Sequence, residues 1–265
     1  MDWQAVLERQ SFQDDDDLDI AETLIALSAA DHPGRDFTAE RTHLESLAEG
    51  ISEQTPLAGE LSRRLAGELG YLGDSETYDD MRNADIAAVI ERRRGLPVAL
   101  GLLYIHAGRT LGWDITGINF PGHFLLRLRN GDGHEIIDPF GGGQVVQPSD
   151  MKAMLAHMAG GEARLHPSYM ASTAVRHVIV RLQNNIKIRA LQAGDTDRAL
   201  EILRRMSLFA PATSSIWLEW SGIMAGQGNM RRAIALLEEG ADHAPDETAL
   251  QTMAEARLAL GRRLN

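Results

Sequence analysis

Two residues with acid–base side chains lie in short apolar segments near the middle of the chain. His123 belongs to Pro121-Gly122-His123-Phe124, and Asp138 belongs to Ile137-Asp138-Pro139-Phe140. An imidazole can act as a general base, and a carboxylate can fix its orientation, when a fold brings the two within hydrogen-bonding distance. Thiol chemistry is excluded, because none of the 265 residues is a cysteine.

The pattern around these residues predicts one buried helix followed by antiparallel strands. Pro97 opens a strongly apolar run that closes at Gly112, as expected of a buried helix with proline in its first turn. The Asn130-Gly131 pair favours a tight turn between two strands. The strands are expected at residues 114–120, 123–129 and 135–137.

This order of elements resembles the transglutaminase-like superfamily, which has a papain-type core. The similarity is closest to its bacterial SirB-type branch, whose motifs resemble residues 93–100 and 119–124. The resemblance covers essentially the whole chain. It implies an α+β, predominantly helical fold, with N-terminal helices at 1–82, a helix-plus-antiparallel-sheet core at 83–170 and C-terminal tetratricopeptide (TPR) repeats at 171–265.

The resemblance also assigns expected roles to single residues. Active members of the superfamily carry a nucleophilic cysteine at the start of the central helix, and that position falls on Pro97. Their catalytic histidine and aspartate match His123 and Asp138. Proline cannot act as a nucleophile, and loss of the nucleophile from such a triad costs several orders of magnitude in rate. We therefore assign no catalytic residue and treat His123 and Asp138 as remnant candidates.

Four roles stay open for this histidine and aspartate. A structural remnant is favoured, and a binding pocket is the next interpretation. Hydrolase or amidase chemistry on a bound water would use His123 as base and Asp138 as its orienting partner. A metal site that adds His134 is the least favoured, because the spacing matches no standard ligand pattern. No cofactor is expected.

The N-terminal segment 1–85 is expected to be helical and is strongly acidic. It carries 21 acidic and 6 basic side chains, a balance of −15 within a net charge of −12, which disfavours direct nucleic-acid binding. The run Asp14–Asp17 is expected to be the solvated start of a helix, and a cation site is the alternative. Helices are expected at 18–30, 38–50 and 56–70.

A fourth helix is expected from Asn83, as its N-cap, to the basic run Arg92-Arg93-Arg94, with Gly95 just beyond its end. Positive charge is favourable at a helix C-terminus, so the three arginines are expected to complement the helix dipole and the acidic neighbours. An anion-binding patch is the alternative interpretation.

The last third of the chain contains an internal repeat. Gly194 and Gly228 are 34 apart in number, as are Ala199 and Ala233 and also Pro211 and Pro245. This period is typical of TPR helix pairs, and two full repeats and a partial third are expected. The repeat register places a set of residues on the concave, partner-binding side: Arg181, Asn184, Ile188, Leu191, Ser215 and Leu218.

Two functions of different class follow. The favoured one is a non-catalytic interaction or adaptor protein, which binds a protein or peptide through the core cleft or the repeat surface and has an indirect regulatory role. The alternative is the water-activating hydrolase. The repeat surface could instead pack on the chain's own core, and the oligomeric state is left open.

With no secretory signal, bilayer-spanning stretch or cysteine, a cytoplasmic location and no membrane partner are expected.

Overall fold

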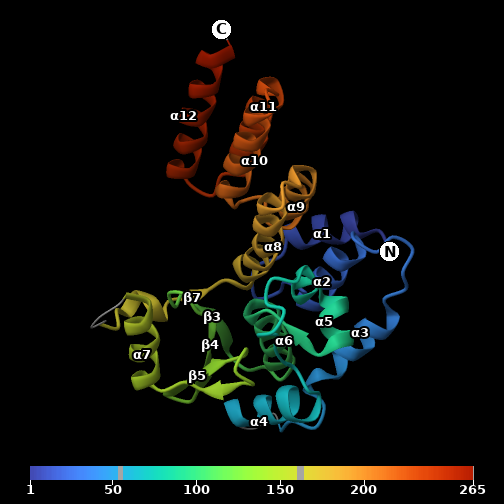
Figure 1. Cartoon of the computed structure of the whole chain (residues 1–265), viewed down its shortest axis with the longest axis vertical. Coiled ribbons are helices and arrows are strands. Elements are labelled where there is room, and N and C mark those ends of the chain that lie inside the picture. Colours follow the sequence, from blue (N-terminus) through green and yellow to red (C-terminus); the bar gives the residue numbers. More distant parts are fainter. Residues whose placement is uncertain (53–55, 160–163, 265) are drawn as a thin grey trace. The chain divides into compact units, whose positions relative to one another are not determined.

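A computed structural model of the chain describes residues 1–52, 56–159 and 164–264 (Figure 1). The chain divides into two compact units. The first unit is formed by Asp14–Leu182, and the second by Asp2–Gln13 together with Gln183–Asn265. The boundary therefore falls inside helix α8 (Val175–Gln192). The predicted limit at residue 83 lies within the first unit, and the three-part division stays a prediction.

The first unit contains a five-stranded sheet in which neighbouring strands are antiparallel. Its strand order is β6-β5-β4-β3-β7. The predicted tight turn joins β4 to β5 through Gly131 and Asp132, with Asn130 opposite Gly133 and Leu126 opposite Ile137 in that pair. The strands are β3 (Ile115–Ile118), β4 (Leu125–Asn130), β5 (Gly133–Asp138), β6 (Gln144–Val145) and β7 (Ser172–Thr173).

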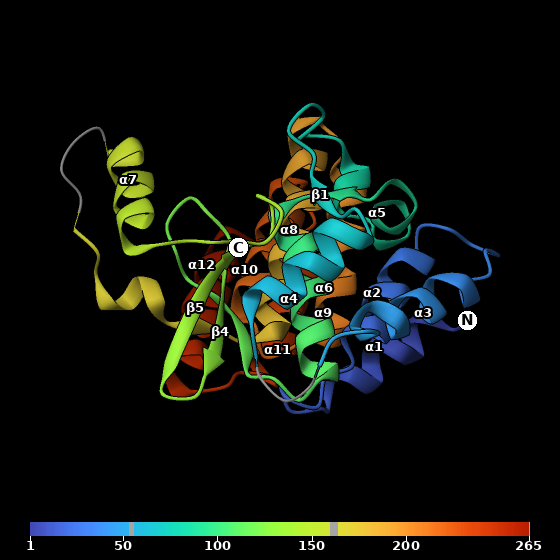
Figure 2. The ribbon, with the colours of Figure 1, turned by 90° about the horizontal axis from the view of Figure 1, so that it is seen from below.

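Helix α6 (Pro97–Thr110) is the central element of this unit, and the prediction of a buried helix here is confirmed. Its residues from Val98 to Ile105 are all buried. It packs closely on the sheet, since a Cβ added at Gly108 would lie 2.6 Å from the Ile115 side chain. Helix α7 (Pro148–Ala159) lies on the other side of the strands, where Met151 and Leu155 join the apolar cluster that includes Leu125 (Figure 2).

The remaining helices of the first unit precede α6, apart from one short helix and the first part of α8, which follow α7. They are α2 (Ile20–Ala29), α3 (Thr38–Glu45), η1 (Ser46–Ala48), α4 (Ala58–Ser62), the π-helical η2 (Arg63–Glu68), η3 (Met81–Ala84) and α5 (Ile86–Arg92); η4 (Pro167–Met170) follows α7. A short parallel pair, β1 (Leu72–Gly73) with β2 (Arg94–Gly95), holds the segment before α6 in place. The helices and strands confirm the predicted α+β, predominantly helical fold class.

The acidic run does not simply start the helix that follows it. Asp19 is the N-cap of α2 and accepts a hydrogen bond from Glu22 N at 2.9 Å. Asp15 instead accepts from the backbone N–H groups of Val175 (2.7 Å) and Arg176 (2.8 Å) at the start of α8. One carboxylate of the run thus supplies the negative charge that a helix N-terminus favours, at a helix 160 residues away.

The predicted ends of the fourth helix are wrong at both sides. Asp85, not Asn83, is the N-cap of α5, and Asn83 is fully buried in η3. The left-handed residue that ends α5 is Arg93 (φ 56°), not Gly95. The parallel pairing of Arg94 with Leu72 supplies the tertiary contacts that hold a non-glycine residue in this conformation.

The second unit consists of helices. They are α1 (Trp3–Ser11), the end of α8, α9 (Thr196–Phe209), α10 (Ser214–Gly226), α11 (Met230–Ala241) and α12 (Glu247–Leu264). The predicted period recurs in the backbone, because Gly194 (φ 78°) and Gly228 (φ 82°) are both left-handed. Asp195 and Asn229, separated by the same period, are the N-caps of α9 and α11.

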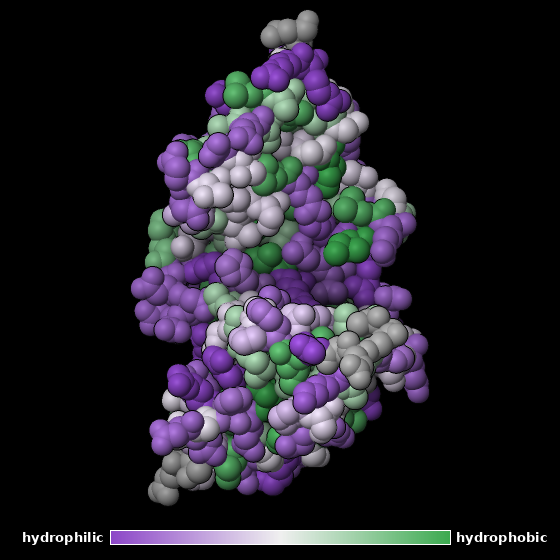
Figure 3. All heavy atoms as spheres, turned by 90° about the vertical axis from the view of Figure 1, so that its left-hand side faces the viewer, coloured by the Kyte–Doolittle hydropathy of each residue, from purple (hydrophilic) through white to green (hydrophobic). Residues whose placement is uncertain are grey.

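Hydrophobic residues reach the surface of both units as separate patches among hydrophilic ones (Figure 3). The most exposed large apolar side chains of the second unit include Phe12 (87%), Leu258 (55%) and Ile188 (49%). Within the described residues, none of the helices combines the length and the apolar composition needed to cross a bilayer.

Candidate functional site

The helix start to which the resemblance assigns the nucleophile is formed by Pro97. Proline is the first residue of α6, and Leu96 precedes it in extended conformation without a side-chain cap. The ring fixes a helical φ and lacks only an N–H that would have no partner inside the helix. Proline therefore suits the helix start but offers no reactive atom there.

An aromatic ring fills the space beside this helix start. Phe124, the last residue of the Pro-Gly-His-Phe segment, is only 3% exposed. A Cβ added at Gly101, one turn after Pro97, would overlap this ring, and a Cβ at Gly117 on β3 would lie 3.2 Å from it. The guanidinium carbon of Arg181 lies 5.3 Å from the ring centroid. Phe124 thus occupies the space between α6 and β3.

His123 is an exposed residue in the turn before β4, not within the strand as predicted. Its ring is tilted against Phe120, with the two ring centroids 6.3 Å apart. Throughout the described ranges, no hydrogen bond or ion pair reaches the His123 side chain. Within that part of the chain, the imidazole therefore lacks the partner that would fix its tautomer.

Asp138 is the last residue of β5, and its carboxylate organises the turn that follows. One carboxylate oxygen accepts from Phe140 N (2.9 Å) and Gly141 N (3.1 Å), and the Asp138 carbonyl accepts from Gly143 N (2.8 Å). These are the bonds of a local turn. Asp138 and His123 are both described residues, and no hydrogen bond joins the carboxylate to the ring, so a base with its orienting partner is not formed.

Two hydroxyl groups lie near this turn, and neither replaces the missing thiol. Burial raises the pKa of the Tyr104 phenol above its usual range. The Ser62 hydroxyl donates to the Ala58 carbonyl at 2.8 Å and also bonds the Gly143 carbonyl. Ser62 therefore gives its proton to carbonyl oxygens and not to a base that would activate it.

A Ser/His/Asp combination does occur elsewhere in the first unit, in the wrong order for catalysis. His32 Nε2 lies 2.8 Å from Asp85 Oδ2, and the Ser28 hydroxyl bonds the other oxygen of the same carboxylate. A catalytic triad needs the imidazole between the hydroxyl and the carboxylate. Here the carboxylate is central and caps α5, so this group is structural.

A hydrogen-bonded network upstream of α6 joins the buried Asp74 and Asn83 to the half-buried Arg92 and the exposed Thr77. Asp74 accepts from the Thr77 hydroxyl (2.6 Å), from Thr77 N (2.8 Å) and from Arg92 Nη2 (2.7 Å). Arg92 Nη1 donates to Asn83 Oδ1 at 2.9 Å. The Thr77 hydrogen bonds, followed by the guanidinium, hold the pKa of Asp74 well below its usual range. The sequence patterns did not indicate this network, although an Asp-x-x-Thr spacing is typical of turns that such side chains stabilise.

A second cluster joins His43, Tyr71 and Arg93. His43 Nε2 lies 2.7 Å from the Tyr71 hydroxyl, and the Arg93 guanidinium contacts both groups. Burial, together with the positive charges of Arg93 and Arg64, lowers the pKa of His43 to about 4. At neutral pH the imidazole is therefore uncharged and accepts at Nε2. Burial raises the pKa of Tyr71 to about 12.

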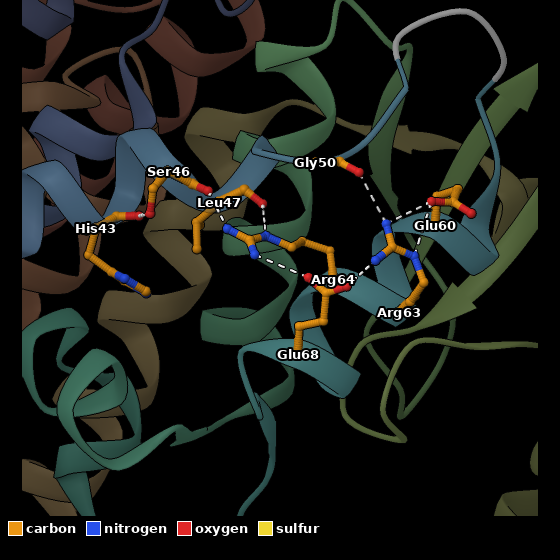
Figure 4. A network of polar contacts seen from close by, with 8 residues as sticks. All are labelled: His43, Ser46, Leu47, Gly50, Glu60, Arg63, Arg64 and Glu68. Atoms are coloured by element: carbon orange, nitrogen blue, oxygen red, sulfur yellow. Dashed lines mark hydrogen bonds and ion pairs between the residues drawn. The ribbon is translucent and has the colours of Figure 1, made fainter.

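Arg64 is held close to His43 by backbone carbonyl groups (Figure 4). Its Nη2 donates to Ser46 O at 2.9 Å and its Nε to Leu47 O at 3.4 Å, while the Ser46 hydroxyl donates to His43 O at 2.8 Å. The guanidinium thus lies at the carbonyl end of the α3–η1 segment, where a positive charge is favourable. Arginines surround an uncharged histidine in this part of the unit.

The predicted repeat-surface residues fall into different environments. Ile188 (49% exposed) and Leu191 (36%) lie one turn apart on α8, and Ser215 on α10 is also exposed. Leu218 packs partly against the Trp217 cluster, and Asn184 is half-buried. Arg181 belongs to the first unit, beside Phe124. Lys187 of α8, next to Ile188 in the sequence, forms an ion pair with Glu219 of α10, next to Leu218.

Metal ligation finds no support in the described ranges, where His, Asp and Glu side chains do not gather in a group of three able to hold an ion. The predicted set of His123, His134 and Asp138 is included in those ranges. His134 is exposed on β5, opposite Arg129 of β4.

Known proteins resemble this chain over most of its length. The family model of the transglutaminase-like superfamily matches residues 37–184. A UPF0162 protein of Xylella fastidiosa (strain Temecula1) is 30% identical over 208 residues, which cover 75% of this chain and 74% of the relative. A UPF0162 protein of Vibrio cholerae is 34% identical over 171 residues, with 60% of this chain and 62% of the relative covered.

A more distant similarity reaches a eukaryotic protein. Human F-box only protein 21 is 25% identical over 181 residues, which are 65% of this chain and 27% of that protein. Among solved structures, menin aligns with a TM-score of 0.45 and 13% identity, over 96% of this chain and 73% of menin.

Proposed function

The chain belongs to the transglutaminase-like superfamily, and from this premise we propose that it is an interaction protein that binds a protein or peptide partner and carries out no thiol-dependent acyl transfer. The observation that carries the proposal is the Phe124 ring packed against Gly101 beside Pro97. An acyl substrate would need that space and a nucleophile next to it. The Phe124 ring fills that space, and Pro97 takes the position of the nucleophile.

The hydrolase alternative receives no comparable support. General-base catalysis requires the base within hydrogen-bonding reach of the proton that it removes, and a partner that holds its tautomer. His123 is exposed and unpartnered among the described residues, and Asp138 bonds its own turn. Binding is therefore the function that the geometry of this region favours.

The proposal assigns partner binding to the second unit as well. The periodic recurrence of left-handed glycines and of N-caps supports a TPR array, and the exposed pair Ile188 and Leu191 supports a surface on it that recognises an apolar segment. The further parts of the proposal are a SirB-type architecture, a cytoplasmic location and an indirect regulatory role. The bacterial UPF0162 relatives are consistent with such a protein.

Cross-linking of the full-length chain in bacterial cells, followed by identification of co-isolated proteins, tests the proposal. Replacing Ile188 and Leu191 together by Asp should remove the partner, because both side chains are exposed and a charge there opposes apolar contact. Leu258→Asp is the matched control, since Leu258 is exposed to a similar degree on α12. Identical partners for all three chains, or none for the wild type, would contradict the proposal.

A further inference from the structure

The first unit contains a polar cavity of about 500 Å³ upstream of α6. It lies where the β1–β2 pair meets the segment 74–77, and it is separate from the space that Phe124 fills. Three arginines line it: Arg82, Arg92 and Arg94. In a chain whose segment 1–85 carries a charge of −15, a cavity lined by three guanidinium groups is unusual.

The three arginines differ in how many of their guanidinium N–H groups already donate hydrogen bonds within the protein. Arg92 is bound through both terminal nitrogens, to Asn83 and Asp74. Arg82 donates through Nε (2.9 Å) and Nη2 (2.6 Å) to the Asp80 carboxylate. Arg94 uses Nη1 alone, which donates to Gly70 O (3.2 Å) and Arg93 O (3.0 Å). No carboxylate among the described residues pairs with Arg94.

The unused part of Arg94 has the geometry of an anion receptor. Its Nε and Nη2 atoms make no hydrogen bond within the described residues. These two N–H groups point in parallel from one edge of the planar guanidinium, and such an edge binds two oxygens of a carboxylate or phosphate at once. The carbonyl bonds at Nη1 and the pairing of β2 with β1 fix the group that carries this edge.

Two acidic residues also line the cavity, and they act differently. Asp74 is buried, and its charge is already compensated by Arg92 and the Thr77 donors. Glu76 is exposed and, within the described part of the chain, has no hydrogen bond or ion pair. Glu76 is thus the uncompensated negative charge at the cavity, and it would oppose an incoming anion.

We infer that this cavity is an oxyanion site, in which the Nε/Nη2 edge of Arg94 binds the carboxylate or phosphate group of a small ligand. The charges of Arg92 and Arg82 are already paired with Asp74 and Asp80, so Arg94 supplies the positive charge that is unpaired among the described residues, and Glu76 weakens the binding. The site goes beyond the proposed function, because it does not depend on the missing nucleophile or on the repeat surface. The arginines of the basic run 92–94 would then have different roles: Arg92 and Arg93 are structural, and Arg94 binds the oxyanion.

The test is a titration of the full-length chain with inorganic phosphate and, separately, with acetate at constant ionic strength. The Nε–H resonance of Arg94, assigned by its loss in Arg94→Gln, is followed by NMR. We expect a saturable shift with at least one of the two anions, and the stronger response identifies the preferred group. Arg94→Gln should weaken binding about tenfold or more, because a bidentate charged contact is lost; for this variant, binding is followed at neighbouring backbone amides.

If Arg94→Gln does not fold, two other variants test the same site. Arg94→Lys retains the positive charge but lacks the two parallel N–H groups of the guanidinium edge, so it should bind the anion more weakly than the wild type. Glu76→Gln changes an exposed side chain and should strengthen binding about two- to threefold, the opposite direction. Arg129→Gln, at an exposed arginine of β4, is the control and should leave binding unchanged. No saturable shift with either anion, or equal binding by Arg94→Gln, would overturn the inference.

Discussion

Two neighbouring regions of the first unit use aspartate and basic residues in opposite ways. Around Pro97, His123 has no polar partner among the described residues, and Asp138 bonds only its own turn. Around Asp74, a buried carboxylate binds a hydroxyl, a backbone N–H and a guanidinium. The region that carries the superfamily's triad positions is the less organised one. The presence of a histidine and an aspartate at the triad positions therefore does not indicate where polar interactions stabilise this unit.

The difference has a physical reason. A buried charged group is tolerated only when it is paired and hydrogen-bonded, so the residues of the Asp74 network depend on one another. An exposed histidine costs nothing when it has no partner. With the nucleophile replaced by proline, the space beside α6 is filled by apolar packing, and the stability of that region depends on shape and not on charge.

The largest effect is expected at the ring that fills the space beside α6. Phe124→Ala should lower the free energy of unfolding by about 3–5 kcal/mol, because it leaves a cavity. Gly101→Ala should cost about 1–3 kcal/mol, since the added methyl overlaps the ring. The double variant should cost less than the sum, because the methyl then enters vacated space. Urea denaturation measures all three, and additive costs would show that the ring does not occupy this position.

A smaller effect is expected in the Asp74 network. Asp74→Asn keeps the shape of the side chain but leaves Arg92 without its counter-ion, and should cost about 2 kcal/mol in urea denaturation. His123→Ala is the paired comparison and should change stability by less than about 0.5 kcal/mol, as expected of an exposed side chain. A larger loss at His123 than at Asp74 would reverse the contrast between the two regions.

The smallest effect concerns the response to acid. The pKa of His43 is about 4 in the folded chain, against 6.5 as its ordinary value. Between these values the unfolded chain binds a proton that the folded chain does not, so stability is full above pH 6.5 and falls as the pH drops towards 4. The loss should be roughly 1–2 kcal/mol, reduced from the full value because His43 is partly exposed.

His43→Gln should reduce this slope between pH 6.5 and 4, measured as thermal or urea stability across that range; burial also lowers the pKa of His106, which accounts for the slope that remains. His134→Gln, at an exposed histidine of β5, is the matched control. The lowered pKa of Asp74 has the same direction of effect, but its loss begins only near pH 4 and below, outside this window. An unchanged slope in His43→Gln would contradict the neutral state of the half-buried imidazole.

Much of the fold follows from local patterns in the sequence. The apolar run after Pro97, the Asn130-Gly131 turn and the periodic glycines Gly194 and Gly228 each predict an element that the structure contains. These signals are local, because a turn or a helix start depends on a few consecutive residues. Helix ends were less predictable. The left-handed residue after α5 is Arg93, and pairing with a strand distant in sequence holds it there.

The candidate site was less predictable, because its contacts join distant segments. Asp15 caps a helix that begins 160 residues later, and Arg92 reaches Asp74 across 18 residues. The sequence places His123 and Asp138 at the ends of neighbouring strands but does not say whether their side chains meet. It also shows a run of three arginines without indicating that Arg94 lines a cavity and has an unused donor edge among the described residues.

The claim to be tested is that the region around Pro97 does not transfer acyl groups, as proposed above. Its most direct test is intact-protein mass spectrometry of the full-length chain after incubation with a panel of peptide amides and thioesters. We predict an unchanged mass and no hydrolysed product above the rate in buffer. A single acyl group on the protein, or product formation that His123→Ala and Asp138→Asn abolish, would contradict the claim.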